Sequence, residues 1–101
     1  MSDSTDYEFE WDDAKAAGNL AKHGVDFMAA MSVLLDPLAM TRFDDGHSDD
    51  EERWVSLGRA ANGQLLLLVH TFSPTGPATA LVRLIPARQA TRRERKQYEN
   101  G

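Results

Sequence analysis

Hydrophobic and polar residues alternate in several short segments of the chain, which is the pattern of β-strands. In residues 7–11 aromatic side chains alternate with acidic ones, as on a half-buried strand. Residues 64–72 instead contain an unbroken apolar run, which indicates a strand covered on both faces. Asn62 and Gly63 precede this run and predict a two-residue hairpin turn in which both residues have positive φ. The predicted strands are 7–11, 38–43, 53–60, 64–72 and 79–86, and 73–77 is predicted to be a loop.

Helix signals occur after the first strand and at the end of the chain. Asp12 or Asp13 can cap a helix that ends before Gly24, and Asp26 can cap a second helix. The second and third predicted helices span 27–35 and 87–100, so the order is β-α-α-β-β-β-β-α. A chain of 101 residues can bury one hydrophobic core. We therefore expect one α+β domain over 1–101, with 1–6 as a disordered tail.

Positive charge is concentrated near the end of an otherwise acidic chain. Residues 83–99 hold six of the eleven Lys and Arg residues and two of the sixteen acids, a local charge of +4. The whole chain carries −5, which leaves −9 on the remainder. A basic segment of this kind favours a polyanion site or an acidic partner.

Composition excludes several classes of protein. The chain has no cysteine, so it has no disulfide framework and no thiolate zinc site. The longest apolar run, Leu65 to Val69, is too short to cross a membrane, and the acidic start lacks the features of a secretory signal. We therefore expect a cytoplasmic protein that does not contact membranes. The P-loop, Rossmann, HExxH and GxSxG motifs are absent from the sequence, and no cofactor is predicted.

Arginine side chains of the predicted last helix form a regular stripe. Arg88, Arg92 and Arg95 are separated by four and three residues, which places them on one helix face. Arg83 alternates with Leu81 and Ile85 on the preceding strand, and we expect it to face inward. These arginines are consistent either with an anion site or with a solvated helix that carries intrahelical Arg–Glu pairs.

The first predicted helix has a second polar stripe. Lys15, Asn19, Lys22 and His23 lie on one of its sides. One interpretation is a solvated face, with the last two residues complementing the helix dipole. The other is a second phosphate-contacting wall with His23 as a proton-transfer group. His70, at the end of the apolar strand, is interpreted more readily as a structural histidine than as a catalytic one.

The acidic segment 44–52 contains clustered carboxylates, but their spacing does not match a calcium-binding loop. We predict no metal site and interpret the segment as a solvated loop in which Ser48 or Asp49 caps a short helical turn. Only Glu52, next to Arg53 at the start of a strand, is placed to face a functional site.

Four segments of the chain, taken in this order, carry a resemblance to one protein family. They are FEWDDAKAAGNLAKHGVDF near the start, Asp36-Pro37, DEERWVSLGRAANGQLLLLVH in the middle and RLIPARQATRRERKQYE at the end. They resemble the BrnT family of type II toxins over about Glu8 to Glu99. The pair of KHGV and ARQATRRER is the most specific part of the resemblance. One departure is Pro86, where the family commonly has serine.

The resemblance implies a RelE-like fold, with a small antiparallel β-sheet, two N-terminal helices and one C-terminal helix. It also implies a metal-independent endoribonuclease that cleaves RNA and is neutralised by a BrnA-type antitoxin. Such an antitoxin binds DNA through a ribbon-helix-helix domain, so this chain would contact DNA only indirectly, within a 2:2 complex. The alternative is a non-catalytic module that docks an acidic segment of the antitoxin through its basic last helix.

Metal-free RNA cleavage requires a base for the 2′-hydroxyl proton, cations for the phosphate and an acid for the leaving 5′-oxygen. Arginine suits the phosphate role because it is always charged and binds in a bidentate manner. The hypothesis assigns Glu52 or His23 as the base and Tyr98 or a histidine as the acid. The arginines expected to act on the phosphate in catalysis are Arg83, Arg88 and Arg95. The cations expected to bind the RNA and its phosphates are Arg92, Lys15, Lys22 and Arg53.

Overall fold

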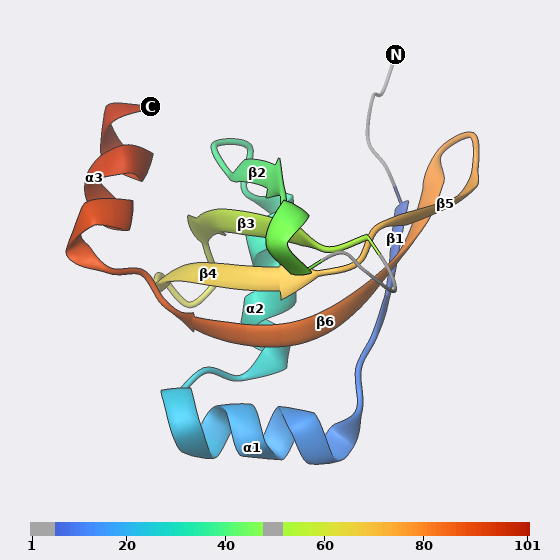
Figure 1. Cartoon of the computed structure of the whole chain (residues 1–101), viewed down its shortest axis with the longest axis horizontal. Coiled ribbons are helices and arrows are strands. Elements are labelled where there is room, and N and C mark those ends of the chain that lie inside the picture. The colour runs from blue at the N-terminus through green and yellow to red at the C-terminus, as the bar shows by residue number, and fades with distance from the viewer. Residues whose placement is uncertain (1–5, 48–51) are drawn as a thin grey trace.

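The computed structural model describes residues 6–47 and 52–101 (Figure 1). The strands are β1 (Asp6–Glu10), β2 (Met40–Phe43), β3 (Trp54–Arg59), β4 (Leu65–His70), β5 (Ser73–Gly76) and β6 (Thr79–Gln89). The helices are α1 (Asp13–His23), α2 (Phe27–Met31) and α3 (Arg92–Asn100), with 3-10 turns at Ser32–Leu35 and Asp45–His47. The α+β class, the two N-terminal helices and the C-terminal helix are confirmed. The predicted cap at Ser48 or Asp49 lies outside the described residues, as do residues 1–5 of the predicted tail. The prediction of a tail was wrong for Asp6, which begins β1 and pairs with Thr79.

The sheet is organised around β6. The strand order is β1-β6-β4-β3-β2, and β5 also pairs with β6. All pairs are antiparallel except β1–β6, which is parallel, so the sheet is mixed. The prediction of a loop at 73–77 was wrong for β5. Pro74 is tolerated there because β5 pairs only with β6, and a proline on an edge strand need not donate a ladder hydrogen bond.

Local side-chain caps determine where the first two helices begin, as predicted. The Asp12 carboxylate accepts a hydrogen bond from the Lys15 N–H, and α1 ends at Gly24, whose φ is 68°. The Asp26 carboxylate accepts from the Met28 N–H at the start of α2. The second helix changes to a 3-10 turn after Met31.

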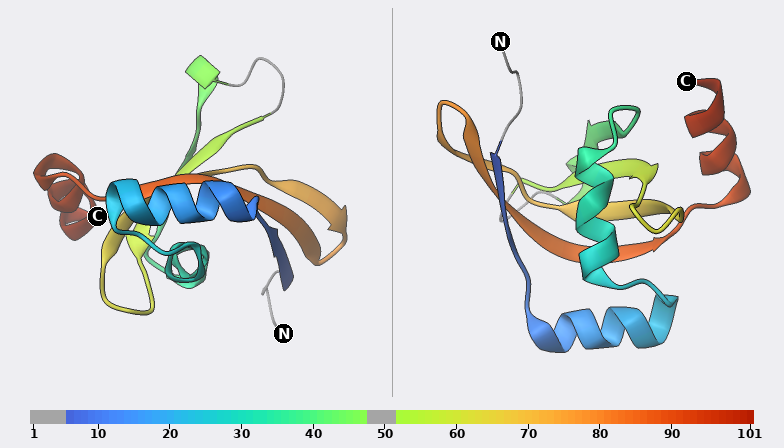
Figure 2. Two further views of the ribbon diagram at one scale, coloured as in Figure 1. Left: turned by 90° about the horizontal axis from the view of Figure 1, so that it is seen from below. Right: turned by 180° about the vertical axis from the view of Figure 1, so that it is seen from behind.

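One face of the sheet is covered by α2, and within the described residues no helix lies across the opposite face, here called the open face. The right view of Figure 2, seen from behind, shows α2 crossing in front of the strands, while α1 runs along β6 and α3 stands apart at one end. The covered face forms the core, since Phe27 of α2 packs with Leu68 of β4 and Val82 of β6, all at most 1% exposed. Alternation along the strands turns residues such as Leu67 to the open face.

A buried asparagine joins α1 to β6. The Asn19 side-chain amide donates to the Val25 carbonyl and accepts from the Ala87 N–H, both at 3.0 Å. Asn19 therefore satisfies one backbone group on the edge of β6 and one in the turn after α1. The interpretation of this helix face as wholly solvated was wrong for Asn19, which is buried.

The β3–β4 turn differs from the predicted one. Only Gly63 has positive φ, at 89°, and no residue other than glycine does so within the described ranges. The Gly63 N–H donates to the Ala60 carbonyl, and the Ala60 N–H donates to the Gln64 carbonyl. The loop thus has three residues with a glycine in the left-handed region at its end. The Asn62 side chain accepts from the Gln64 N–H, which holds Asn62 in this turn.

The boundary between β6 and α3 also differs from the prediction. Leu68 pairs with Ala87 but His70 pairs with Leu84, so β6 has one extra residue in a bulge around Pro86. The proline does not end the strand because its missing N–H falls where the ladder is interrupted. Arg88 therefore lies on the strand, and its predicted place on a helical stripe was wrong. Thr91 caps α3 in a capping box with Glu94.

Candidate RNA-binding groove and catalytic residues

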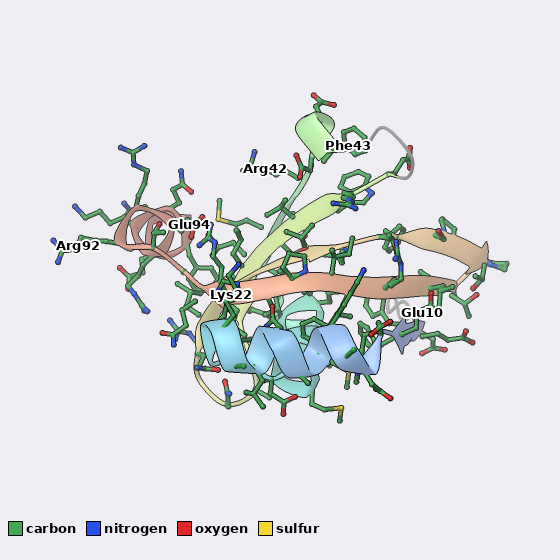
Figure 3. All side chains as sticks on the ribbon, turned by 60° about the horizontal axis from the view of Figure 1, so that its bottom comes forward. Glu10, Lys22, Arg42, Phe43, Arg92 and Glu94 are labelled. Carbon is green, nitrogen blue, oxygen red and sulfur yellow. The ribbon has the colours of Figure 1, made fainter. Side chains whose placement is uncertain are left out.

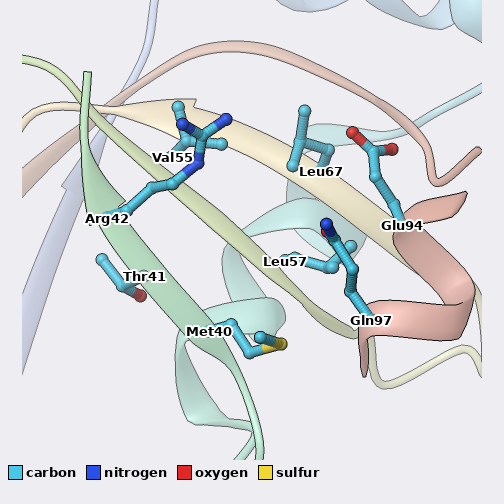
Figure 4. A pocket seen from close by; sticks show the side chains of 8 residues that line it. All are labelled: Met40, Thr41, Arg42, Val55, Leu57, Leu67, Glu94 and Gln97. Carbon is cyan, nitrogen blue, oxygen red and sulfur yellow. The ribbon is translucent and has the colours of Figure 1, made fainter. Parts of the chain in front are cut away.

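A groove of about 190 Å³ lies on the open face between β2 and α3 (Figure 4). Val55 and Leu57 of β3 and Leu67 of β4 form its apolar floor, because they alternate with the core-facing residues of the same strands. Its walls come from β2 and α3. The wall residues are Met40, Thr41, Arg42, Glu94 and Gln97.

The start of α3 is fixed by an ion pair. Arg88 donates two hydrogen bonds to Glu94, from Nη1 to Oε1 at 2.8 Å and from Nη2 to Oε2 at 2.9 Å. Glu94 also accepts from the Thr91 N–H. The bonds from Arg88, assisted by Thr91 and opposed by burial, lower the pKa of Glu94 to about 2. Arg88 thus orients α3 beside the groove and already has a carboxylate partner.

The far end of α3 is fixed by Tyr98. Its hydroxyl donates to Asp36 Oδ2 at 2.6 Å, and the Arg59 guanidinium lies 5.6 Å from the centre of its ring. Burial opposes ionisation of Asp36, but hydrogen bonds from the Arg59 N–H, Tyr98 and the Leu38 N–H outweigh it and lower the pKa of Asp36. The bond to Asp36 raises the pKa of Tyr98. Tyr98 therefore serves as an anchor for α3.

The remaining cations of α3 are exposed. Arg92, Arg93, Arg95 and Lys96 lie on the surface, and Arg92 points away from the sheet (Figure 3). In the same view Arg42 and Glu94 lie on one side of the sheet. The helix thus adds positive charge beside the groove, but Arg92 does not line it.

Glu52 and Arg83 line a second hollow, together with Glu10 and Thr71. This hollow lies toward the end of the sheet where Glu10 of β1 is in register with Arg83 of β6. The prediction that Arg83 faces inward was wrong, because Val82 and Leu84 are the core-facing neighbours. Arg83 is half-buried and lies on the face opposite α2, the same face as Leu67.

Lys15, Lys22 and His23 line a third, shallow hollow between α1 and β6, which also includes Pro86. These residues do not line the groove or the hollow of Glu52 and Arg83. Arg53 is half-buried just before β3. Within 6–47 and 52–101, no three His, Cys, Asp or Glu residues are grouped so as to hold a metal ion.

The His70 side chain is buried. It lies at the end of a hydrogen-bonded chain formed by the hydroxyl groups of Thr41 and Ser56. Its Nδ1 is 2.8 Å from the Thr71 carbonyl, so this nitrogen carries the proton. Nε2 then accepts from the Ser56 hydroxyl at 2.8 Å, and the Thr41 hydroxyl donates to Ser56 at 2.8 Å. Burial lowers the pKa of His70, and the bond to Thr71 opposes this effect only in part. Folding therefore favours the neutral imidazole, and the interpretation of His70 as structural fits this geometry.

The chain should lose stability as the pH falls below about 6.5, the ordinary pKa of histidine. The pKa of His70 is lowered on folding, so the unfolded chain binds the proton more tightly. The free energy of unfolding is then fully present above that pH and decreases below it, by at most about 1.4 kcal/mol per pH unit. Urea unfolding as a function of pH measures this slope. His70→Gln should flatten it and His23→Gln should preserve it; equal slopes in all three proteins would contradict the assignment.

Sequence reasoning missed Arg42 and Gln97, which face each other across the groove (Figure 4). The only available signal was the alternation of Met40 and Arg42 on one face of a short strand. That signal does not reveal which strand or helix lies opposite.

The chain thus combines a mixed sheet that has one open face with a basic C-terminal helix at the edge of that sheet. A family model described as "Ribonuclease toxin, BrnT, of type II toxin-antitoxin system" matches residues 11–94. This chain belongs to the BrnT family. The crystal structure of the Brucella abortus ribonuclease toxin BrnT is similar, with a TM-score of 0.55 and 23% identity over 87% of this chain and 100% of that chain. No curated protein matched the chain in a sequence comparison. Within the described ranges, no helix has the length and apolar character needed to span a membrane.

Proposed function

We propose that this chain is an active, metal-independent endoribonuclease that cleaves RNA on the open face of its sheet. The observation that carries the proposal is that two arginines, Arg42 and Arg83, lie on this uncovered face. Guanidinium groups on an open surface suit the closely spaced phosphates of a single strand. Family membership supplies the class of reaction.

The proposed site of chemistry is the hollow that contains Glu52 and Arg83. Glu52 accepts the proton of the 2′-hydroxyl, and Arg83 neutralises the phosphate as charge develops on it. His23 is a weaker candidate for the base because it lies in the hollow beside α1. Tyr98 is a weaker candidate for the acid because its hydroxyl is committed to Asp36.

We further propose that the chain acts in the cytoplasm and is held inactive by a BrnA-type ribbon-helix-helix antitoxin in a 2:2 complex. The exposed cations Arg92 and Arg95 of α3 offer an acidic antitoxin segment a docking surface. Contact with DNA then occurs only through the antitoxin. The same surface supports the alternative, a non-catalytic module that retains antitoxin binding alone.

Purified chain should cleave single-stranded RNA in the presence of EDTA, and its expression without antitoxin should arrest growth. Glu52→Gln and Arg83→Gln should each reduce the cleavage rate by about 10²- to 10³-fold, the range for a positioned base or a phosphate-neutralising group. RNA gel analysis and growth curves measure these effects. Asp45→Asn, an exposed carboxylate in the loop before β3, is the matched control and should keep full activity.

Thermal unfolding verifies that each variant is folded. Intact RNA and normal growth with folded, wild-type protein would favour the non-catalytic module. Cleavage that disappears with EDTA and returns with a divalent cation would contradict the metal-independent reaction.

A further inference from the structure

We infer that the groove between β2 and α3 binds one adenine nucleotide of a single-stranded RNA. In this subsite Arg42 holds the phosphate, the floor packs against the base and Gln97 contacts the base edge. The inference rests on the proposed function and deepens it, because it assigns a base preference to the same open face.

Arg88 is not available to a phosphate in this conformation. Both of its terminal nitrogens donate to Glu94, and that carboxylate is also part of the cap of α3. A phosphate at Arg88 would have to displace this carboxylate and open the capping box. The ion pair also cancels the negative charge of Glu94, so the remaining charge within the groove is that of Arg42.

Arg42 is available. It is exposed on β2, in register with Val55, and its side chain reaches over the groove floor (Figure 4). In the ranges 6–47 and 52–101, no hydrogen bond or ion pair engages its guanidinium group. A guanidinium with unused donors at the rim of an apolar groove is suited to bidentate contact with a phosphate.

The floor and the volume of the groove limit what can bind beside that phosphate. Val55 and Leu57 are only 7% and 5% exposed, so the half-buried Leu67 provides most of the aliphatic surface on which a flat ring can lie. The groove measures about 190 Å³. This is below the range of about 300–1,000 Å³ found for drug-sized ligands, so one base fits and a larger ligand does not.

Gln97 supplies the specificity. Its amide offers a donor and an acceptor side by side, and Figure 4 shows it reaching into the groove from the α3 wall. Glutamine pairs in this way with N6 and N7 of adenine. Single-stranded RNA exposes these base edges, so such a contact can select adenine.

The test is binding of two uncleavable 2′-O-methyl oligonucleotides, one of uridines alone and one with a central adenine. Wild-type protein should bind the adenine-containing strand about tenfold more tightly, which corresponds to about 1.4 kcal/mol. Arg42→Gln should weaken binding of both strands about tenfold and reduce the salt dependence by about one phosphate contact. Gln97→Leu should abolish the preference for adenine and leave uridine binding unchanged. Arg93→Gln removes a cation of α3 that does not line the groove, and should bind both strands within about twofold of wild type.

Equal binding of the two strands by wild-type protein, or wild-type affinity in Arg42→Gln, would overturn the subsite. Cleavage of natural RNA is measured in parallel to separate the two proposals. If Arg42→Gln cleaves RNA at the wild-type rate, the ribonuclease proposal is retained and the subsite proposal is contradicted. If the protein shows no cleavage activity but its binding of the oligonucleotides depends on Arg42 and Gln97, the subsite proposal is supported and the ribonuclease proposal is contradicted.

Discussion

Asn19→Ala is expected to lower the free energy of unfolding by about 3 kcal/mol, because it removes both hydrogen bonds of a buried amide. The Val25 carbonyl and the Ala87 N–H would each lose their partner, and each buried group without one costs about 1–3 kcal/mol. The shallow hollow next to Asn19 lets water replace part of this loss, so we expect the lower half of the summed range. Urea unfolding should show the change, with a decrease in melting temperature of roughly 12–24 °C.

The control is the same substitution at Asn100, which is exposed at the end of α3. Asn100→Ala should change the free energy of unfolding by no more than about 0.5 kcal/mol. Equal effects of the two substitutions would mean that the bridge between α1 and β6 contributes nothing to stability.

Gly58→Ala is expected to destabilise the chain by about 1–3 kcal/mol through overpacking. A Cβ on Gly58 would lie 2.9 Å from Cγ1 of Val33 and 3.0 Å from Cβ of Ala39. Neither contact is with the end of a long, flexible side chain, so the 3-10 turn after α2 would have to move away from β3. Chemical unfolding measures the loss, and an unchanged midpoint would show that this turn can adjust without cost.

Gly18→Ala provides the matched comparison, because it is expected to raise the free energy of unfolding whereas Gly58→Ala lowers it. Gly18 lies within α1 and a Cβ there would meet nothing within 4 Å. Alanine should stabilise this helix by about 0.5–1 kcal/mol because it has less backbone freedom to lose on folding. A loss of stability at both positions would indicate that close contact is not what distinguishes Gly58.

The parts of the fold that were predictable depend on neighbouring residues. Asp12, Gly24 and Asp26 act on backbone groups within a few residues, so their capping roles follow from sequence order alone. The boundary at Pro86 did not follow from sequence order. Pairing of Ala87 with Leu68, nineteen positions away, extends β6 past the proline, and no local pattern contains that contact.

The candidate site was predictable in residue type but not in arrangement. Excess arginine near the C-terminus indicated an anion site, yet Arg88 forms a closed pair with Glu94 and Arg83 lies in a different hollow. Arg42 comes from a segment with no basic excess, and it reaches the groove only because β2 pairs with β3 and α3 is anchored at Asp36. Both conditions depend on contacts between residues that are far apart in the sequence, so no local pattern predicts them.

Because β6 is the strand around which the sheet is organised, its position in the sequence determines when the sheet can fold during synthesis. β1, β4 and β5 all pair with β6, and Glu8 meets Leu81 across most of the chain. A growing chain that has not yet released β6 therefore cannot assemble the sheet, and contacts between such distant residues form slowly. The face that carries both Arg42 and Arg83 therefore forms only after β6 has been synthesised. Any ligand that recognises this face as a whole can therefore bind only after β6 has left the ribosome.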